Sequence, residues 1–306
     1  MKQLLPLLLL LLTIPFLRVG HSALPLQNNA KVEVQKTQLA DGLWFLAASG
    51  AVQGNVVVSI GKDGVLIVDD FEDKFFPQIK AAIATLTDKP IRFIINTHWH
   101  PDHAGSNKRF GEAGVLIAAH ENVRKRLSSD QFIELFKAPV KAETAAAWPV
   151  ITCQNEMTFH FNDEEIQVLH QPRAHTDGDV VVHFRKANVV HFGDTFMTEM
   201  YPFIDWSSGG TLDGIIAMTD RMQPLINPAT KLVPGHGRLG KLEDLQAYRA
   251  MLIGIRAELV PLVQAGKPLP AIQQAKPTKR FDDRWGKGFF NPDMFVMMAW
   301  QAMQDR

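Results

Sequence analysis

Side chains that commonly bind metal ions are crowded into one short string, and this string constrains the chain more than any other feature. Residues 98 to 103 read His-Trp-His-Pro-Asp-His and come one residue after the apolar run 91–96. Such a run is typical of a buried strand, and a strand that ends in a tight turn can direct alternate side chains at two neighbouring points. Neutral imidazole and carboxylate groups suit zinc and similar divalent ions. The string therefore predicts a site for two metal ions, and an exposed polar loop is the alternative.

Three later segments offer the further ligands that two ions require. A hydrolytic metal site needs about three protein ligands for each ion and an open position for water. His175 lies in the turn-like segment 174–179, Asp194 follows the apolar run 188–191, and His236 lies between two glycines after the strand-like residues 231–233. Each segment alone is a weak signal, since an Asp-Thr pair is a common turn or helix cap. Together with the first string they predict one shared site.

The ordered set of ligand candidates resembles the metal-binding residues of the metallo-β-lactamase superfamily of binuclear metallohydrolases. The set comprises His98, His100, Asp102, His103, His175, Asp194 and His236, and the resemblance covers about residues 40 to 240. It implies an α/β (α+β) fold, the four-layer αββα sandwich, with two Zn²⁺ ions at one edge. Other divalent ions, such as those of Fe or Mn, would suit the same ligand types.

The resemblance also implies how the ligands divide between the ions. The first ion would be held by His98, His100 and His175, the second by Asp102, His103 and His236, with Asp194 bridging them. In the zinc-dependent β-lactamases of the family a cysteine or serine commonly stands where this chain has Asp194, whereas a bridging aspartate is the pattern of glyoxalase II. This difference disfavours β-lactam hydrolysis and leaves the expectation of a metallohydrolase unchanged.

Carboxylates near the string are candidates for supporting roles. Asp102 is expected both to bind the second ion and to orient the attacking water, with a role as a ligand alone as the alternative. Asp69, at the end of an early strand-like run, and Asp177, two residues after His175, are candidates to hydrogen-bond imidazoles and fix their tautomers. Aspartate is also common in ordinary turns, which is the alternative for both residues.

The other histidines and the single cysteine match no ligand motif. We expect structural or exposed roles for His120, His160, His170, His183 and His191. Because Cys153 is the only cysteine, the chain can form no intramolecular disulfide, and Cys153 is expected to be a small buried apolar side chain.

Apolar periodicity predicts alternating strands and helices before a strand-rich second half. A hairpin is expected at residues 55–60 and 65–69, joined by the glycine-bounded residues 61–64. Helices are expected at 74–86, 121–136 and 212–222, and further strands at 115–118, 157–161, 166–169, 180–184 and 189–192. Towards the end, a long helix at 242–265, a connector at 268–279 and a last helix at 292–303 are expected to pack against the sandwich.

The first residues resemble a secretory signal. Met1 and Lys2 precede a leucine-rich stretch up to residue 16, which is too short for a comfortable membrane span, and small residues follow it. We expect removal of residues 1–23 and a periplasmic or secreted protein, with an uncleaved anchor as the alternative. The remaining residues 24–306 are expected to form a single domain, with the motif core at about 40–240 and a helical region at 241–306.

The balance of charge and the aromatic residues indicate what kind of molecule the chain binds. The 32 basic and 32 acidic side chains balance, which argues against binding of nucleic acid by phosphate neutralisation. We expect a small-molecule substrate and no stable membrane association after signal cleavage. Tyr201, Phe203 and Trp206 are candidate pocket walls, and residues 137–150 a candidate mobile cover. An aromatic pocket favours an apolar or amide-bearing molecule, while core packing is the alternative for Phe203 and Trp206.

Four functions fit these observations. The first is an exported zinc hydrolase of a small carbonyl compound, with a β-lactam as the leading named substrate because of export and family likeness. The second is a thioesterase or lactonase of the glyoxalase II type, which Asp194 favours. A phosphodiesterase is third, disfavoured by the balanced charge and the signal. A non-catalytic metal-binding protein is fourth, disfavoured because the ligand set is complete.

Overall fold

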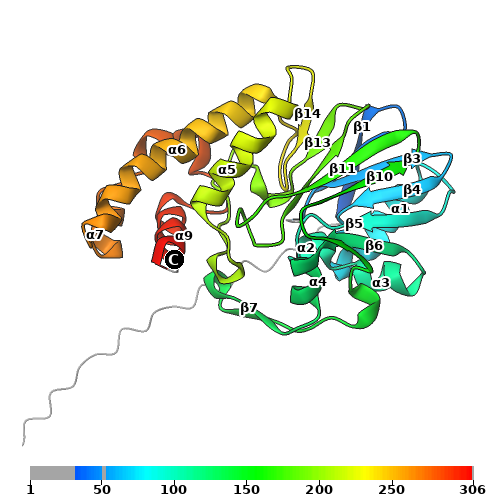
Figure 1. Cartoon of the computed structure of the whole chain (residues 1–306), viewed down its shortest axis with the longest axis horizontal. Coiled ribbons are helices and arrows are strands. Elements are labelled where there is room, and N and C mark those ends of the chain that lie inside the picture. Colours follow the sequence, from blue (N-terminus) through cyan, green and yellow to red (C-terminus); the bar gives the residue numbers. More distant parts are fainter. Residues whose placement is uncertain (1–31, 50–52, 305–306) are drawn as a thin grey trace, which may run out of the picture. The chain divides into compact units, whose positions relative to one another are not determined.

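The computed structural model describes residues 32–49 and 53–304, which form two large β-sheets with helices on their outer faces (Figure 1). The expected signal, residues 1–23, lies outside the described residues, so cleavage and export stay predictions. Among the described residues, no helix combines the length and apolar character needed to cross a membrane.

The first sheet has seven strands, in the order β1-β2-β3-β4-β5-β6-β9. Its strands are β1 (Glu33–Ala40), β2 (Leu43–Ser49), β3 (Val56–Gly61), β4 (Gly64–Val68), β5 (Ile91–Ile95), β6 (Leu116–His120) and β9 (Ile151–Cys153). The expected hairpin is present as the antiparallel pair β3 and β4. Because β4 and β5 are parallel, their carboxyl ends lie at the same edge, from which the loops of Asp69 and His98 leave the sheet.

The second sheet has five strands, in the order β10-β11-β12-β13-β14. Its strands are β10 (Glu156–Phe161), β11 (Glu164–His170), β12 (Val180–Phe184), β13 (Val189–His191) and β14 (Lys231–Val233). The parallel pairing of β13 with β14 brings the residues that follow them together, although they are far apart in sequence. Those residues include Asp194 and His236.

Alternation along the strands explains the four layers. In β4, Leu66 and Val68 face an apolar cluster that also contains β11 and β12 side chains, so this cluster lies between the two sheets. Val65 and Ile67 face a second cluster with α1 (Phe76–Ala84) and α3 (Asn107–Glu112). The outer face of the second sheet packs against α5 (Leu212–Met222) and α6 (Leu242–Gln264). Strands buried on both faces read as continuous apolar runs, and the expected αββα sandwich is confirmed.

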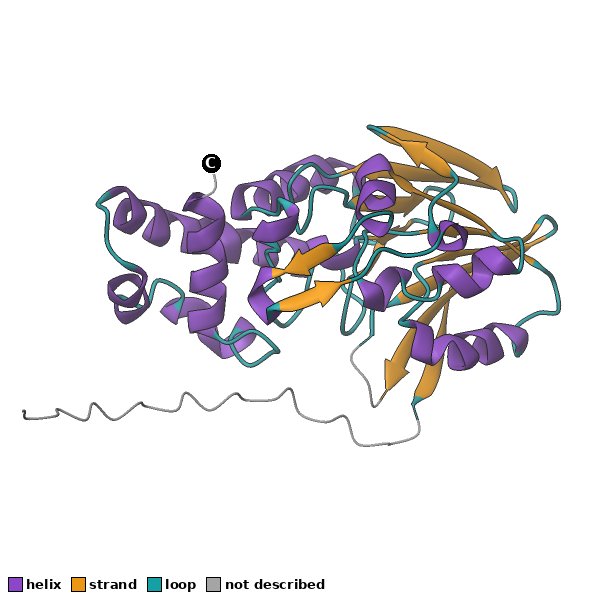
Figure 2. Ribbon diagram, turned by 90° about the horizontal axis from the view of Figure 1, so that it is seen from below, coloured by secondary structure: helices purple, strands orange, loops and turns teal. Residues whose placement is uncertain are grey.

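One expected helix is shorter than its sequence pattern indicates. The helix expected at 121–136 is α4 (Glu121–Leu127), and the chain then forms the hairpin β7 (Gln131–Ile133) and β8 (Ala138–Val140), with the 3₁₀ turn η2 (Glu134–Phe136) between them. Ser128 and Ser129 both donate their hydroxyl groups to the carbonyl of Lys125, which ends the helix. The hairpin stands apart from both large sheets (Figure 2).

The remaining helices are short or belong to the C-terminal region. They are α2 (Pro101–Ala104), α7 (Leu269–Gln274), α8 (Asp282–Trp285) and α9 (Pro292–Gln304). The long helix and the last helix are present as expected, whereas the expected connector at 268–279 contains α7. Side chains of α6 and α9 share one core cluster with the second sheet, as their positions in Figure 1 suggest. The C-terminal region therefore packs against the sandwich.

We predict that Phe184→Ala lowers the free energy of unfolding by about 3 to 5 kcal/mol, because a fully buried ring between the sheets would leave a cavity. Val150→Ala is the control, since Val150 is 63% exposed and should change stability by less than about 0.5 kcal/mol. Urea denaturation of both variants checks this, and equal midpoints would show that the inter-sheet layer is not the main core.

Candidate metal centre

All seven ligand candidates converge at one edge of the sandwich. His98 and His100 follow β5, Asp102 and His103 lie on α2, His175 lies between β11 and β12, Asp194 lies in the 3₁₀ turn η4 (Gly193–Thr195) after β13, and His236 follows β14. They form a first group, His98, His100 and His175, and a second group, Asp102, His103 and His236, and within each group the possible ligand atoms lie within 4.8 Å of one another. The same holds for His98, His103 and Asp194, which link the two groups. Loops from both sheets thus build one site.

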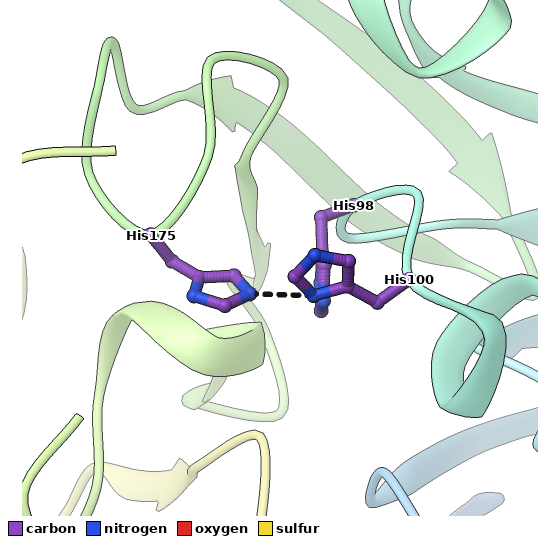
Figure 3. A group of neighbouring side chains, drawn as sticks. All are labelled: His98, His100 and His175. Carbon is purple, nitrogen blue, oxygen red and sulfur yellow. Dashed lines mark hydrogen bonds between the residues drawn. The ribbon is translucent and has the colours of Figure 1, made fainter. Parts of the chain in front are cut away.

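The first group consists of three buried imidazoles that face a common point (Figure 3). Nδ1 of His100 lies 2.9 Å from Nε2 of His175. The ring of His98 is 4.8 Å from that of His100 and 4.6 Å from that of His175, nearly perpendicular to both. Nε2 of His98 is buried and has no hydrogen-bond partner.

In each imidazole of this group, one ring nitrogen points away from the common point. Hydrogen bonds on these outer nitrogens fix the tautomers. Nε2 of His100 lies 2.9 Å from Oδ2 of Asp205, and Nδ1 of His175 lies 2.8 Å from the carbonyl oxygen of Phe203. A carboxylate and a carbonyl can only accept, so both ring nitrogens donate. Nδ1 of His98 is 3.0 Å from the Thr97 hydroxyl, which gives its own proton to Asp69 and therefore accepts.

The inner nitrogens of the first group consequently present lone pairs to one another. Burial lowers the pKa of His175 to about 4 and that of His98 well below its ordinary value, so both imidazoles stay neutral near pH 7. Neutral imidazole is the form that binds metal. Two nitrogens on one tetrahedral zinc ion lie roughly 3.4 Å apart, because each Zn–N bond is about 2.1 Å long. Three convergent buried acceptors, one of them without a partner, fit a divalent cation.

The second group combines imidazoles with carboxylates. His103 binds Asp69 through Nδ1, at 2.7 Å from Oδ2. Its Nε2 lies 3.0 Å from Oδ1 of Asp194 and 3.3 Å from Nε2 of His236. Oδ2 of Asp102 lies 3.2 Å from the same nitrogen of His236. Acceptor atoms again converge, so this group fits a second cation.

Asp194 lies between the two groups. Its Oδ2 is 3.4 Å from Nε2 of His236 and 3.7 Å from Nε2 of His175, which belong to different groups. Gly235 leaves the space for this carboxylate, since a Cβ there would stand 2.0 Å from Oδ1 of Asp194. The arrangement allows Asp194 to contact two cations at once.

The carboxylates create a field that favours positive charge. Burial lowers the pKa of His236, but Asp194 and Asp102 outweigh it and raise that pKa to about 10. Burial also disfavours ionised Asp194, yet His236 and His103 hold the pKa of Asp194 well below its usual range. The carboxylates are therefore ionised at neutral pH and attract either protons or a metal cation.

Asp69 has the supporting role expected for it. Besides His103, it accepts hydrogen bonds from the backbone N–H and the hydroxyl of Thr97, at 2.7 and 2.8 Å. It is fully buried, and its φ of 64° lies in the left-handed region that favours glycine. Strain of this kind persists where surrounding hydrogen bonds impose it, and it clusters at functional sites.

The expectation for Asp177 is wrong, and Asp205 stands in its place. The Asp177 carboxylate forms an ion pair with Arg126 at 2.8 Å. Asp179 instead accepts from the backbone N–H groups of His175 and Thr176, at 2.6 and 2.8 Å. Asp205 lies 105 residues after His100, the imidazole that it binds, and so gave no local signal in the sequence. The hydrogen bond from His100 lowers the pKa of Asp205 although burial opposes it.

Asn55 holds the loop of His236, a role that the sequence did not suggest. Its side-chain amide donates to the carbonyls of Pro234 and Gly237, at 2.9 and 3.0 Å, and its backbone N–H donates to Gly235 at 2.7 Å. The carbonyl of Asn55 accepts from Nε2 of His191 at 2.9 Å. His191 is therefore structural, as expected. It holds Asn55, which in turn holds the His236 loop.

The three pocket candidates, Tyr201, Phe203 and Trp206, lie in different surroundings. Tyr201 is fully buried, donates to Asp282 at 2.9 Å and stacks on Phe295 at 4.6 Å, so it is a core residue and the pocket role is wrong. Phe203 packs beside the first group, 5.6 Å from His100 and 5.3 Å from His175. Trp206 is partly buried against the core that α6 shares, which matches the alternative of core packing.

The other histidines and Cys153 lie outside these groups. His120 and His170 stack at 3.7 Å, His183 is buried, and His160 is exposed. Within the described ranges, none of these four joins a group that could hold a metal. Cys153 is buried, as expected.

Sequence comparisons find similarity to a known family and to a hydrolase. The metallo-β-lactamase superfamily model matches residues 49–238. A hydroxyacylglutathione hydrolase from Erythrobacter litoralis is 28% identical over 123 residues, which are 40% of this chain and 39% of that protein. The match thus spans about two fifths of that relative's length.

The fold of this chain is similar to those of solved metallo-β-lactamase structures. A metallo-β-lactamase from Pontibacter korlensis has a TM-score of 0.56 at 18% identity, covering 72% of this chain and 99% of its own. The DIM-1 metallo-β-lactamase has the same TM-score at 19% identity, covering 72% of this chain and 98% of its own. At such identities the likeness supports the fold alone.

We predict that Asp205→Ala lowers zinc affinity at the first group roughly 10- to 100-fold, because His100 loses the acceptor that fixes its tautomer. Asp177→Ala is the matched control and should leave zinc binding unchanged, since its carboxylate pairs with Arg126. Competitive titration against a zinc chelator measures both variants. Equal affinities for Asp205→Ala and the unaltered protein would show that Asp205 does not orient the ligand.

For Asn55→Ala we predict that the second metal ion is affected and the first is not, the reverse of the effect of Asp205→Ala. Two carbonyls of the His236 loop would lose their donor, so the second ion should be lost while the first is retained. Elemental analysis after dialysis should give about one metal per chain in place of two. Full retention of both ions would contradict the positioning role.

Proposed function

Because the chain belongs to the metallo-β-lactamase superfamily, we propose that it is a zinc-dependent hydrolase of a small carbonyl compound, with a thioester or lactone as the preferred class. The observation that carries this proposal is the convergence of two groups of possible ligand atoms on a shared carboxylate, Asp194. A site built only for structure would be closed on all sides, whereas Asp102 keeps its side chain 26% exposed.

Each ligand candidate has a proposed place. His98, His100 and His175 would hold one ion, Asp102, His103 and His236 the other, and Asp194 would contact both. Two such cations supply an activated water and a Lewis acid for the bond under attack. The protein's own part is to fix the imidazole tautomers through Asp69, Asp205 and the carbonyl of Phe203.

Asp102 is the proposed catalytic residue. His103 and His236 outweigh burial and lower the pKa of Asp102, so its carboxylate is ionised and can only accept hydrogen bonds. It is the most exposed member of the site, followed by His236 at 14%, whereas His175 is fully buried. Asp102 therefore lies on the solvent side of the centre, where its carboxylate can accept a hydrogen bond from the attacking water and orient it.

The nature of the shared ligand favours thioesters or lactones over β-lactams. Asp194 offers two oxygens, of which Oδ1 faces His103 and Oδ2 faces His175 and His236. This is the bridging aspartate typical of the glyoxalase II type, and the partial match to a hydroxyacylglutathione hydrolase supports the same class. The balanced charge of the chain gives no support to a polyanionic substrate.

A panel of three substrates tests the proposal. The zinc-loaded protein should hydrolyse an acyl thioester faster than a chromogenic cephalosporin or an aryl phosphodiester, and a chelator should abolish this activity. His98→Ala and His236→Ala should each lower bound zinc and reduce turnover at least 100-fold, because each removes a ligand. Turnover of the cephalosporin alone would overturn the preferred class, and activity unaffected by chelator would overturn the metal-dependent reaction.

We also propose export, on the strength of the leucine-rich first residues. N-terminal sequencing of the protein from a periplasmic fraction would test it. A first residue at about position 23 or 24 supports cleavage, and an intact Met1 contradicts it.

A further inference from the structure

We propose that four phenylalanines beside the metal centre bind an apolar acyl or aryl group of the substrate, next to the bond that is hydrolysed. These residues are Phe136, Phe203, Phe289 and Phe290, and we name them the aromatic wall. The inference rests on the proposed function and adds to it the chemical class of the group attached to the carbonyl. Two of the four, Phe289 and Phe290, lie beyond the residues 49–238 that match the superfamily.

The aromatic wall begins at the ligands themselves. The ring of Phe203 lies nearly parallel to that of His100, with 5.6 Å between centroids and 17° between planes. Phe290 stacks on Phe203 at 5.4 Å. Phe136 meets Phe203 at 5.5 Å, and Phe289 meets Phe290 at 4.9 Å. The rings thus form a continuous apolar series that starts at a metal-binding imidazole.

The aromatic wall ends at the surface of the protein. Phe203 and Phe290 are 6% and 7% exposed, whereas Phe136 is 37% and Phe289 51% exposed. The rings of Phe136 and Phe289 lie 6.2 Å apart, so the two exposed rings are neighbours. Large exposed aromatic groups that adjoin a buried apolar series are typical of binding sites, because a bound apolar group would remove their surface from water.

Both exposed rings are held by the segment that carries Phe203 and Asp205. The backbone N–H of Glu134, in the turn of Phe136, donates to the Ser207 hydroxyl at 3.3 Å. On the other side, the backbone N–H of Tyr201 donates to the carbonyl of Trp285 at 3.1 Å. A Cβ on Gly288 would stand 2.4 Å from Cβ of Met200, so this glycine permits close packing just before Phe289. The aromatic wall is therefore fixed relative to His100.

The charged side chains beside Phe136 do not favour an ionic substrate group. Glu134 and Lys137 flank Phe136 and pair with each other at 2.6 Å. An exposed pair of this kind contributes little net potential. Recognition at this surface would therefore depend on apolar contact, which increases with the length of a bound acyl chain.

The experiment compares acyl chain lengths in the zinc-loaded protein. We expect kcat/KM for thioesters from acetyl to octanoyl to rise by up to about fourfold for each added methylene, the ratio given by burial of one CH₂. Phe136→Ala and Phe289→Ala should each reduce kcat/KM for the octanoyl substrate about tenfold or more and leave the acetyl substrate within about twofold. Bound zinc should be unchanged.

Phe132→Ala is the matched control. Phe132 lies on β7 of the same hairpin, pairs with Pro139 and is 43% exposed, which is similar to Phe136. It should keep the chain-length dependence of the unaltered protein. Equal losses on short and long acyl chains in the Phe136 and Phe289 variants, or the same loss of chain-length dependence in Phe132→Ala, would overturn the inference.

A binding measurement separates this inference from the proposed function. Calorimetric titration with octanoate and with acetate needs no turnover. Tighter binding of octanoate that is lost in Phe289→Ala supports the aromatic wall, and equal affinity of both carboxylates in the unaltered protein contradicts it. Absence of turnover for every ester and thioester would instead overturn the proposed function.

Discussion

Nitrogen lone pairs that face one another in a dry interior are the constraint on which the site depends. Asp205 and the carbonyl of Phe203 take the outer protons of His100 and His175, so the inner nitrogens, 2.9 Å apart, can only accept. Convergent buried acceptors repel unless a cation lies between them. The free energy that holds them in place comes from apolar packing between and outside the two sheets. Apolar packing thus offsets the repulsion among these acceptors and keeps the cation site preformed.

Elements outside the superfamily match support the same site. Tyr201 fixes the segment before Asp205 by stacking on Phe295 of the last helix. The chain just beyond His236 is fixed by Arg238, which pairs with Asp244 at 3.1 Å, and Asp244 pairs in turn with Arg284 at 2.9 Å. Both ends of the centre are therefore braced by the C-terminal region. The C-terminal region thus carries none of the seven ligand candidates but packs against the loops that do.

Much of the centre could be read from the sequence, because its ligands follow buried strands and the string at residues 98–103 names four of them. The partners of those ligands could not, since Asp205 and Asn55 meet His100 and the His236 loop only through tertiary contact. Helical spacing beyond Leu127 was misleading, because the Ser128 and Ser129 hydroxyls end α4. Of the aromatic wall, the sequence indicated only Phe203 as a pocket residue, because Phe136, Phe289 and Phe290 join it through tertiary contact.

Diffraction from zinc-soaked crystals, recorded above and below the zinc absorption edge, tests the central claim most directly. Two anomalous peaks roughly 3.5 to 4 Å apart are expected, one beside His98, His100 and His175 and one beside Asp102, His103 and His236, with Asp194 in contact with both. A single peak, or peaks away from these side chains, would contradict a shared two-ion centre.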